Sequence, residues 1–358
     1  MEQGGLMARK TFRKVITSPE LIEQINPLNQ KLVTRYLKNF DTKRADSSVK
    51  VYKSNFNIFF CWNILENDNK FFVDIRKSEM MDFFDYCITE LKWSSNRYAQ
   101  MWSSLSSLST FIENILDDEY PDFRNIVKKI EKVPKAVVRE KTILSEEQVV
   151  SLLEHLVKEH RTQEACLFAL AVCSGCRASE LFRFTTDVID ENNTAYEGLF
   201  LETSKEIVTK GRGKTGKLLY KYILKDKFLP YYNEWIKERN KILEETKQKH
   251  DFLFIKQDGT PANVELGEVW CAKWEKFLNE DDKTNPNKKE IHLYFHSMRH
   301  YLCTYLSRVG LEQELIVDLF GWSSSDMYKI YNDLSSKDKK WKGLDKLKTA
   351  IQEDAPET

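Results

Sequence analysis

Apolar residues between Ser47 and Leu116 recur at helical spacing in three successive groups. The groups are Val49, Tyr52, Phe56, Phe59 and Phe60, then Met80, Met81, Phe83 and Phe84, then Tyr98, Met101, Trp102, Leu105, Leu108, Phe111 and Ile112. Side chains three or four positions apart share one face of a helix, so each group predicts an amphipathic helix. A further amphipathic segment covers residues 21–40, and Asn67-Asp68-Asn69 indicates a loop between the first two groups. This pattern predicts a helical bundle.

The helical pattern stops over residues 132–142, a stretch with a proline and several basic residues. Residues 145–148 then form a capping box, which opens a new helix. Further helical segments lead to two short β-like runs, residues 198–202 and 218–223, which flank a glycine-containing turn over residues 211–216. Helices return after the second run. The second half of the chain therefore predicts a mixed domain.

We predict a mainly α protein, in which an all-α bundle precedes an α+β domain with a small antiparallel β-sheet. A chain of 358 residues suits two domains of about 100–200 residues each. The predicted divisions are a basic N-terminal arm (1–17), the helical bundle (18–133), a linker (134–144), the α+β domain (145–335) and a tail helix (336–358).

The overall charge is balanced, with 55 lysines and arginines against 55 aspartates and glutamates, so the net field favours no polyanionic partner. Basic residues instead crowd residues 124–141 and 205–221, although solvated surfaces often have such a composition. The seven cysteines are scattered through apolar segments, and no apolar run approaches the ~20 residues of a membrane span. We expect a cytoplasmic protein without a membrane partner.

The first candidate for chemistry is Arg177, in a segment (173–180) that follows an apolar helix. Its guanidinium stays charged and can donate two parallel hydrogen bonds to one phosphate. Glu180 allows the simpler interpretation of an ion pair. Cys173 and Cys176 would suggest a redox dithiol or half a zinc site, but no second cysteine pair accompanies them. Small core side chains are therefore the preferred interpretation of these cysteines.

His296 and Arg299 form the second candidate, because residues three apart on a helix share a face and can reach one ligand. Histidine passes protons near neutral pH, and arginine stabilises charge on a pentacoordinate phosphorus. His292, His296 and His300 are spaced by four, which raises a metal site as the alternative. The zinc-protease helix also needs a glutamate as general base, and this segment lacks one, so no metal is predicted.

Two tyrosines, Tyr328 and Tyr331, follow the dipeptide Gly321-Trp322 and form the third candidate. A phenol has an ordinary pKa of about 10, so a nucleophilic tyrosine needs cations nearby or removal of its proton during attack. Most tyrosines only pack. Neither residue stands out when it is considered alone.

Taken in order, these segments make residues 141–333 resemble the catalytic domain of the tyrosine recombinase, or phage integrase, family. Residues 174–181 are similar to the first arginine box of the family, and residues 296–300 are similar to the second. Gly321-Trp322 resembles the Gly-His box, in which some members carry tryptophan. The family nucleophile lies nine positions after that histidine or tryptophan, which indicates Tyr331.

The resemblance implies a cofactor-free transesterification, in which the tyrosine attacks a DNA phosphate and a hairpin lysine protonates the leaving 5′ oxygen. By pattern alone, the helical bundle resembles the core-binding domain with which the family grips DNA. The implied catalytic residues are Arg177, Lys214, His296, Arg299, Trp322 and Tyr331, with Glu180 and His300 as supports and Lys210 as the alternative lysine.

The implied function is recombination at specific sites in double-stranded DNA by a homotetramer, with integration or excision of a mobile element as the expected outcome. In a bacterium or its phage, such a protein would work at the nucleoid. The alternatives are resolution of chromosome or plasmid dimers, DNA relaxation by a topoisomerase, and a catalytically idle DNA-binding protein of the same fold. The participation of an accessory directionality factor stays open, as does docking of the tail in cis or in trans.

Overall fold

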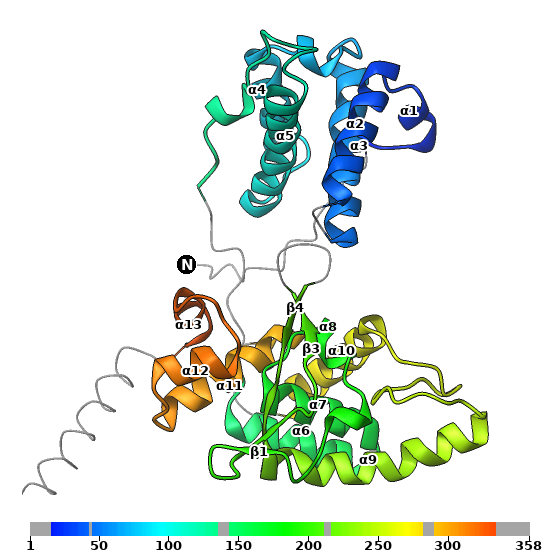
Figure 1. Ribbon diagram of the computed structural model, residues 1–358, viewed down its shortest axis with the longest axis vertical. Coiled ribbons are helices and arrows are strands. Elements are labelled where there is room, and N and C mark those ends of the chain that lie inside the picture. Colours follow the sequence, from blue (N-terminus) through cyan, green and yellow to red (C-terminus); the bar gives the residue numbers. More distant parts are fainter. Residues whose placement is uncertain (1–15, 43–44, 135–142, 211–215, 282–289, 334–358) are drawn as a thin grey trace, which may run out of the picture. The chain divides into compact units, whose positions relative to one another are not determined.

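The structure is a computed structural model, which describes residues 16–42, 45–134, 143–210, 216–281 and 290–333 (Figure 1). These residues form two compact units, one that ends at residue 134 and one that begins at residue 143. The predicted tail helix, almost all of the predicted arm and most of the predicted linker lie outside them. Within the described ranges, no helix is both long enough and apolar enough to cross a membrane.

The first unit is helical in every segment that the structure describes as regular, which confirms the predicted bundle. Ser94 caps its last long helix by accepting a hydrogen bond from the backbone N–H of Arg97 at 3.3 Å. In the predicted loop, Asp68 and Asn69 adopt φ values of +52° and +51°, a region that short polar side chains tolerate. The helices are α1 (Pro19–Glu23), α2 (Pro27–Asp41), α3 (Asp46–Glu66), α4 (Lys77–Thr89) and α5 (Ser95–Ile115), with short 3₁₀ turns at Phe72–Asp74 and Val127–Lys129.

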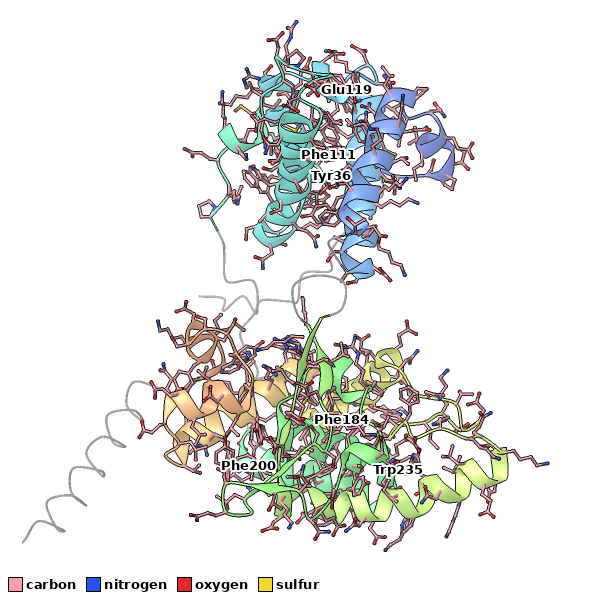
Figure 2. The ribbon with its side chains drawn as sticks, in the orientation of Figure 1. Tyr36, Phe111, Glu119, Phe184, Phe200 and Trp235 are labelled. Carbon is pink, nitrogen blue, oxygen red and sulfur yellow. The ribbon has the colours of Figure 1, made fainter. Side chains whose placement is uncertain are left out.

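Aromatic side chains from three helices meet in the core of this unit, and two of them, Tyr36 and Phe111, are labelled in Figure 2. The ring of Tyr36 on α2 meets Phe56 on α3 edge-on, with centroids 5.4 Å apart, and meets Phe111 on α5 at 5.5 Å. All three side chains are buried. The faces that the apolar spacing predicted are therefore the faces that pack together, and edge-to-face rings stabilise them beyond their buried area.

The second unit combines helices with short antiparallel strands, which confirms the predicted α+β class. Its first helix begins with the predicted capping box, in which Ser145 and Gln148 exchange side-chain and backbone hydrogen bonds. The helices are α6 (Glu146–Lys158), α7 (Thr162–Ser174), α8 (Ala178–Leu181), α9 (Lys225–Thr246), α10 (Val264–Asp281), α11 (Phe295–Arg308), α12 (Gln313–Leu319) and α13 (Asp326–Tyr331), with a 3₁₀ turn at Thr186–Val188. The strands are β1 (Thr194–Ala195), β2 (Phe200–Glu202), β3 (Ile207–Thr209), β4 (Lys217–Leu219) and β5 (Tyr222–Leu224).

Strand pairing on the two sides of the predicted turn is divided between two sheets. The predicted run 218–223 is divided between β4, which pairs with β3, and β5, which pairs with β2 in a three-stranded sheet of order β1-β2-β5. The division falls at Lys221, whose backbone N–H donates to the side chain of Thr203 at 3.0 Å. Residues 217–223 therefore leave one sheet and enter another.

The core of the second unit surrounds α7, whose residues 164–174 are all buried. A helix that is apolar on every side belongs in the interior, and α7 packs against α6, α9 and α11. Phe184 and Trp235 are among the largest fully buried side chains of the unit (Figure 2). The indole N–H of Trp235 donates to the carbonyl of Leu253 at 2.9 Å. The candidate site begins at residue 175, where α7 ends.

Candidate active site

A tight turn after α7 positions Arg177. Gly175 ends the helix at φ +59°, a left-handed conformation that costs other residues roughly 1 kcal/mol or more. A Cβ atom at this position would lie 2.6 Å from Cε1 of Phe320, so there is no room for a side chain. Arg177 follows as the N-cap residue of α8. The requirement for glycine thus comes from both the backbone and the neighbouring ring.

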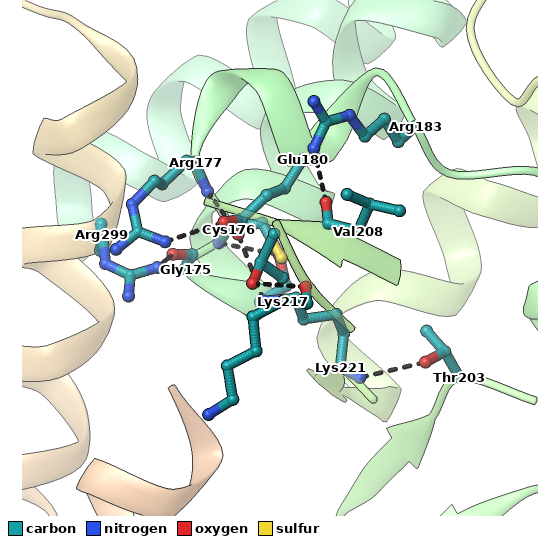
Figure 3. Close-up of polar contacts among 12 residues, drawn as sticks. Gly175, Cys176, Arg177, Glu180, Arg183, Thr203, Val208, Lys217, Lys221 and Arg299 are labelled. Carbon is teal, nitrogen blue, oxygen red and sulfur yellow. Dashed lines mark hydrogen bonds and ion pairs between the residues drawn. The ribbon is translucent and has the colours of Figure 1, made fainter. Parts of the chain in front are cut away.

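Arg177, Glu180 and Lys221 form a network of ion pairs (Figure 3). Nη1 of Arg177 donates to Oε1 of Glu180 at 2.8 Å, and its backbone N–H donates to Oε2 at 3.2 Å. Nζ of Lys221 donates to the same Oε2 at 3.2 Å. Burial raises the pKa of Glu180, but the charges of Lys221 and Arg177 outweigh it and hold that pKa below its usual value. Glu180 is therefore a buried carboxylate that anchors the first arginine.

Arg299, on α11, is the second arginine of the site and is only 1% exposed. Its Cζ lies 4.8 Å from the ring centre of Phe320 and 5.3 Å from that of Tyr331. Nη1 donates to the carbonyl of Gly175, but Nε and Nη2 have no hydrogen-bond partner among the described residues. A buried donor without an acceptor costs ~1–3 kcal/mol. Two such donors on one cation indicate a site for an anion.

Tyr331 ends α13 and is buried, with 6% exposure. Its ring stacks on Trp322, with centroids 5.3 Å apart and planes at 19°, and it lies 4.6 Å from the ring of His300. Nε1 of Trp322 is buried and, within the described ranges, has no hydrogen-bond partner. The structure thus brings Tyr331, Arg299 and Trp322 into one cluster, together with unpaired donors.

Tyr328 differs from Tyr331 in the contacts of its hydroxyl. This oxygen accepts hydrogen bonds from Nδ2 of Asn332 at 2.6 Å and from Oγ of Ser307 at 3.1 Å. Both partners hold the phenol in the packing between α11 and α13. This geometry supports the choice of Tyr331 over Tyr328 that the spacing from Trp322 indicated.

His296 lies exposed on the first turn of α11, 6.4 Å from the ring of Tyr331. Loss of water on its protein-facing side lowers its pKa, and the charges of Arg299 and Arg177 lower it further. Both cations are therefore within electrostatic reach of this ring. Because the pKa of His296 is lowered, its ring is uncharged at neutral pH and can accept a proton.

His300 is fixed by a partner that the motifs did not reveal. Its Nδ1 lies 2.6 Å from Oδ2 of Asp333, two residues after Tyr331. The backbone N–H of Asp333 donates to Oγ1 of Thr304 at 3.1 Å, which ties the same segment to α11 a second time. A carboxylate near a tyrosine indicates no particular site in a sequence. Only this contact therefore identifies Asp333 as part of the candidate site.

The hairpin lysines are only partly described. Thr209 pairs with Lys217 at the end of the β3–β4 ladder, so residues 210–216 connect the two strands. Lys214 lies outside the described residues, and its role stays a prediction. Lys210 is described, and its charge contributes, after larger causes, to the lowered pKa of His296. Lys210 is therefore within electrostatic reach of the site.

The rival metal and redox interpretations find no support in the parts of the chain that the structure describes. Three or more histidine, cysteine or acidic side chains suitable for a metal ion do not gather anywhere in those parts. Cys173 and Cys176 are free and buried, and burial raises the pKa of Cys173 to about 12. A thiol held in its protonated form is a poor nucleophile and a poor metal ligand.

Comparisons with known proteins show which family the chain matches. Residues 142–338 match the model of the phage integrase family. A SPbeta prophage-derived recombinase-like protein, YomM, of Bacillus subtilis is 25% identical over 265 residues, which cover 72% of this chain and 75% of that protein. A tyrosine recombinase of Thermosipho africanus is 23% identical over 299 residues, 83% of this chain and 92% of that protein.

Solved structures share the fold. The Tn1549 transposon integrase in complex with transposon right end DNA has a TM-score of 0.63 at 16% identity, covering 89% of this chain and 99% of that chain. A lambda integrase from a tetramer bound to a Holliday junction has a TM-score of 0.58 at 13% identity, covering 85% of this chain and 77% of that chain.

The family match and the named recombinase relatives define the class of this protein, an enzyme that breaks and rejoins DNA strands. The chain belongs to the phage integrase family. It is a tyrosine site-specific recombinase, and the resemblance that the motifs indicated is confirmed.

Proposed function

We propose that Tyr331 is the nucleophile of DNA strand cleavage and that Arg177, Arg299, His296 and Trp322 surround the scissile phosphate. One observation carries the proposal. Nε and Nη2 of Arg299 and Nε1 of Trp322 are buried without partners in the described structure, beside the ring of Tyr331. A phosphate oxygen is the acceptor that such donors lack, and donors fixed in advance stabilise the charge that develops on a phosphorane.

The chemistry is a transesterification that conserves bond energy. The phenol oxygen of Tyr331 attacks phosphorus, the bond from phosphorus to the 5′ oxygen breaks, and a 3′-phosphotyrosine forms. The phenol proton passes to a base, and we assign this role to His296, because its ring lies 6.4 Å from the ring of Tyr331 and its pKa is lowered. A 5′ hydroxyl of the partner duplex then attacks the phosphotyrosine and releases Tyr331. This sequence consumes no cofactor.

The relatives support a proposal for the DNA substrate and the assembly. Double-stranded DNA with specific recombination sites, bound by four protomers, is the partner that we propose, because a lambda integrase tetramer and transposon integrases with DNA share the fold. Integration or excision of a mobile element is the favoured outcome, given a prophage-derived relative. Resolution of chromosome or plasmid dimers by the same chemistry is the second candidate.

A suicide substrate that traps covalent adducts tests the nucleophile. Tyr331→Phe removes only a hydroxyl, so DNA binding should survive while the adduct disappears. Tyr328→Phe is the matched control and should form adduct, because its hydroxyl serves packing. Adduct in the Tyr331 variant, and none in the Tyr328 variant, would contradict the assignment. Binding without adduct in the wild-type protein would favour the catalytically idle alternative.

The general acid is tested with a 5′-bridging phosphorothiolate, whose thiolate leaves without a proton. Lys214→Ala should slow cleavage of ordinary DNA severely and cleave the sulfur substrate at a normal rate. Lys210→Ala should cleave both substrates at a normal rate. The reverse pattern would transfer the role to Lys210, whose charge acts on His296.

A further inference from the structure

Lys221 is a lysine buried between two sheets of the second unit. Only 5% of it is exposed, and it stands between β4 and β5. Its backbone is held on both sides by Thr203, whose Oγ1 accepts the N–H of Lys221 at 3.0 Å and whose N–H donates to the carbonyl of Lys221 at 2.9 Å. A lysine is rarely buried unless its charge is paired, so the burial of Lys221 depends on its partner.

That partner is the carboxylate that also holds Arg177. Glu180 is completely buried, and it receives one bond from Nζ of Lys221 and two from Arg177 (Figure 3). Arg177 and Glu180 alone would sum to zero charge. With Lys221, the three groups keep one net positive charge. Because the side chain of Arg177 is the only one of the three with substantial exposure, 24%, that charge is presented through Arg177.

We propose that Lys221 is a positioning residue for strand cleavage, which neutralises Glu180 so that Arg177 keeps both its orientation and its positive charge for the scissile phosphate. The inference rests on the proposed role of Arg177. Lys221 itself does not touch the DNA. Through Lys221, the strand junction supports Arg177. Among the described residues, Arg177 and Lys221 are the only cations hydrogen-bonded to Glu180.

The charges that act on Glu180 come from three parts of the unit. Arg177 belongs to the cap of α8, Lys221 to the strand junction, and Arg299 to α11, where its pKa is affected by the charges of Arg177 and Glu180. Removal of Lys221 leaves a fully buried carboxylate paired with one arginine. The charge of Glu180 then fully offsets the charge of Arg177, so the phosphate faces a site with one positive charge fewer.

The test measures the first-order rate of covalent adduct formation at saturating protein, with DNA binding measured separately. Lys221→Met has a similar volume and no charge, and it should cleave about 100-fold more slowly while binding DNA normally, as with loss of one transition-state donor. Lys221→Arg keeps the charge and should stay within about tenfold of the wild type. Lys237→Met, in an exposed pair with Glu234 on α9, is the matched control and should cleave at the wild-type rate.

A charge-restoring double variant separates positioning from packing. Glu180→Gln with Lys221→Met removes one charge of each sign, so the net charge returns to that of the wild type and the rate should recover at least about tenfold relative to Lys221→Met. If Lys221 served packing alone, Lys221→Met should cleave faster than Lys221→Arg, because methionine suits an apolar interior better than the larger arginine does. If Lys221→Met is insoluble, the double variant decides, and a rate within about tenfold of wild type supports the proposal.

Three results would overturn the inference. These are a wild-type rate for Lys221→Met, equal losses in the methionine and arginine variants, and a double variant that cleaves no faster than Lys221→Met. Arg177→Gln distinguishes this failure from a wrong catalytic assignment. If Arg177→Gln cleaves normally, the proposed function of the site has failed. If it loses cleavage while Lys221→Met keeps it, only the role of Lys221 is wrong.

Discussion

Replacement of Arg299 by methionine should abolish cleavage without destabilising the DNA-free protein. The guanidinium is 1% exposed, and it carries two donors that lack partners in the described structure. Each such donor costs ~1–3 kcal/mol, and desolvation of the charge adds several kcal/mol. Two kinds of contact stabilise the buried guanidinium. A charged hydrogen bond to Gly175 contributes about 1.5–3 kcal/mol, and contacts with aromatic rings contribute about 0.5–2 kcal/mol.

The balance predicts that Arg299→Met leaves the free energy of unfolding unchanged or raises it by ~1–3 kcal/mol. Adduct formation should fall by about a thousandfold or more, which corresponds to ~4 kcal/mol of lost transition-state stabilisation. Urea unfolding of the DNA-free protein and single-turnover cleavage supply the two numbers. A loss of stability above ~2 kcal/mol would refute the reasoning, because the guanidinium would then be a structural group and not one reserved for an anion. The matched control is Arg239→Met, since Arg239 is equally buried but donates to the carbonyls of Phe252 and His250, and this variant should be destabilised.

Three further predictions follow from neighbouring contacts. Gly175→Ala should lower the free energy of unfolding by roughly 2 kcal/mol or more, from a left-handed backbone and a clash with Phe320, and thermal melting checks it. Asp333→Ala should slow adduct formation about tenfold at unchanged DNA affinity, because it frees the segment after the nucleophile from His300, whereas normal cleavage would make the contact incidental. The lowered pKa of His296 means that the folded protein keeps this ring neutral where the unfolded chain protonates it. Its contribution to stability is therefore present above the ordinary pKa of about 6.5 and is lost as pH falls through the lower folded value. The cleavage rate should likewise fall as pH drops through the lowered pKa of His296. If His296→Gln shows the same fall at low pH, His296 is not its source.

The order of the motifs along the chain was sufficient to predict the family, and the helical and β-like patterns were sufficient to predict the α+β class and the bundle that precedes it. Phosphoryl transfer by a tyrosine needs particular side chains, and by resemblance to the family the nine-residue spacing from Trp322 indicates Tyr331 as the nucleophile. Apolar periodicity predicted the helix faces that now pack around Tyr36. Both signals are local, so they can be read without knowing how distant segments meet.

Tertiary structure alone decided which groups act on these residues. Lys221 and Asp333 carry ordinary side chains, and only the folded chain brings Lys221 to Glu180, 41 residues away, and Asp333 to His300, 33 residues away. The division of residues 217–223 between two sheets likewise depends on partners elsewhere, since a short β-like run has no preference for one edge over another. The sequence by itself determined the chemistry available to this recombinase. The charge and unpaired donors around Arg299 were decided by burial, which no local pattern records.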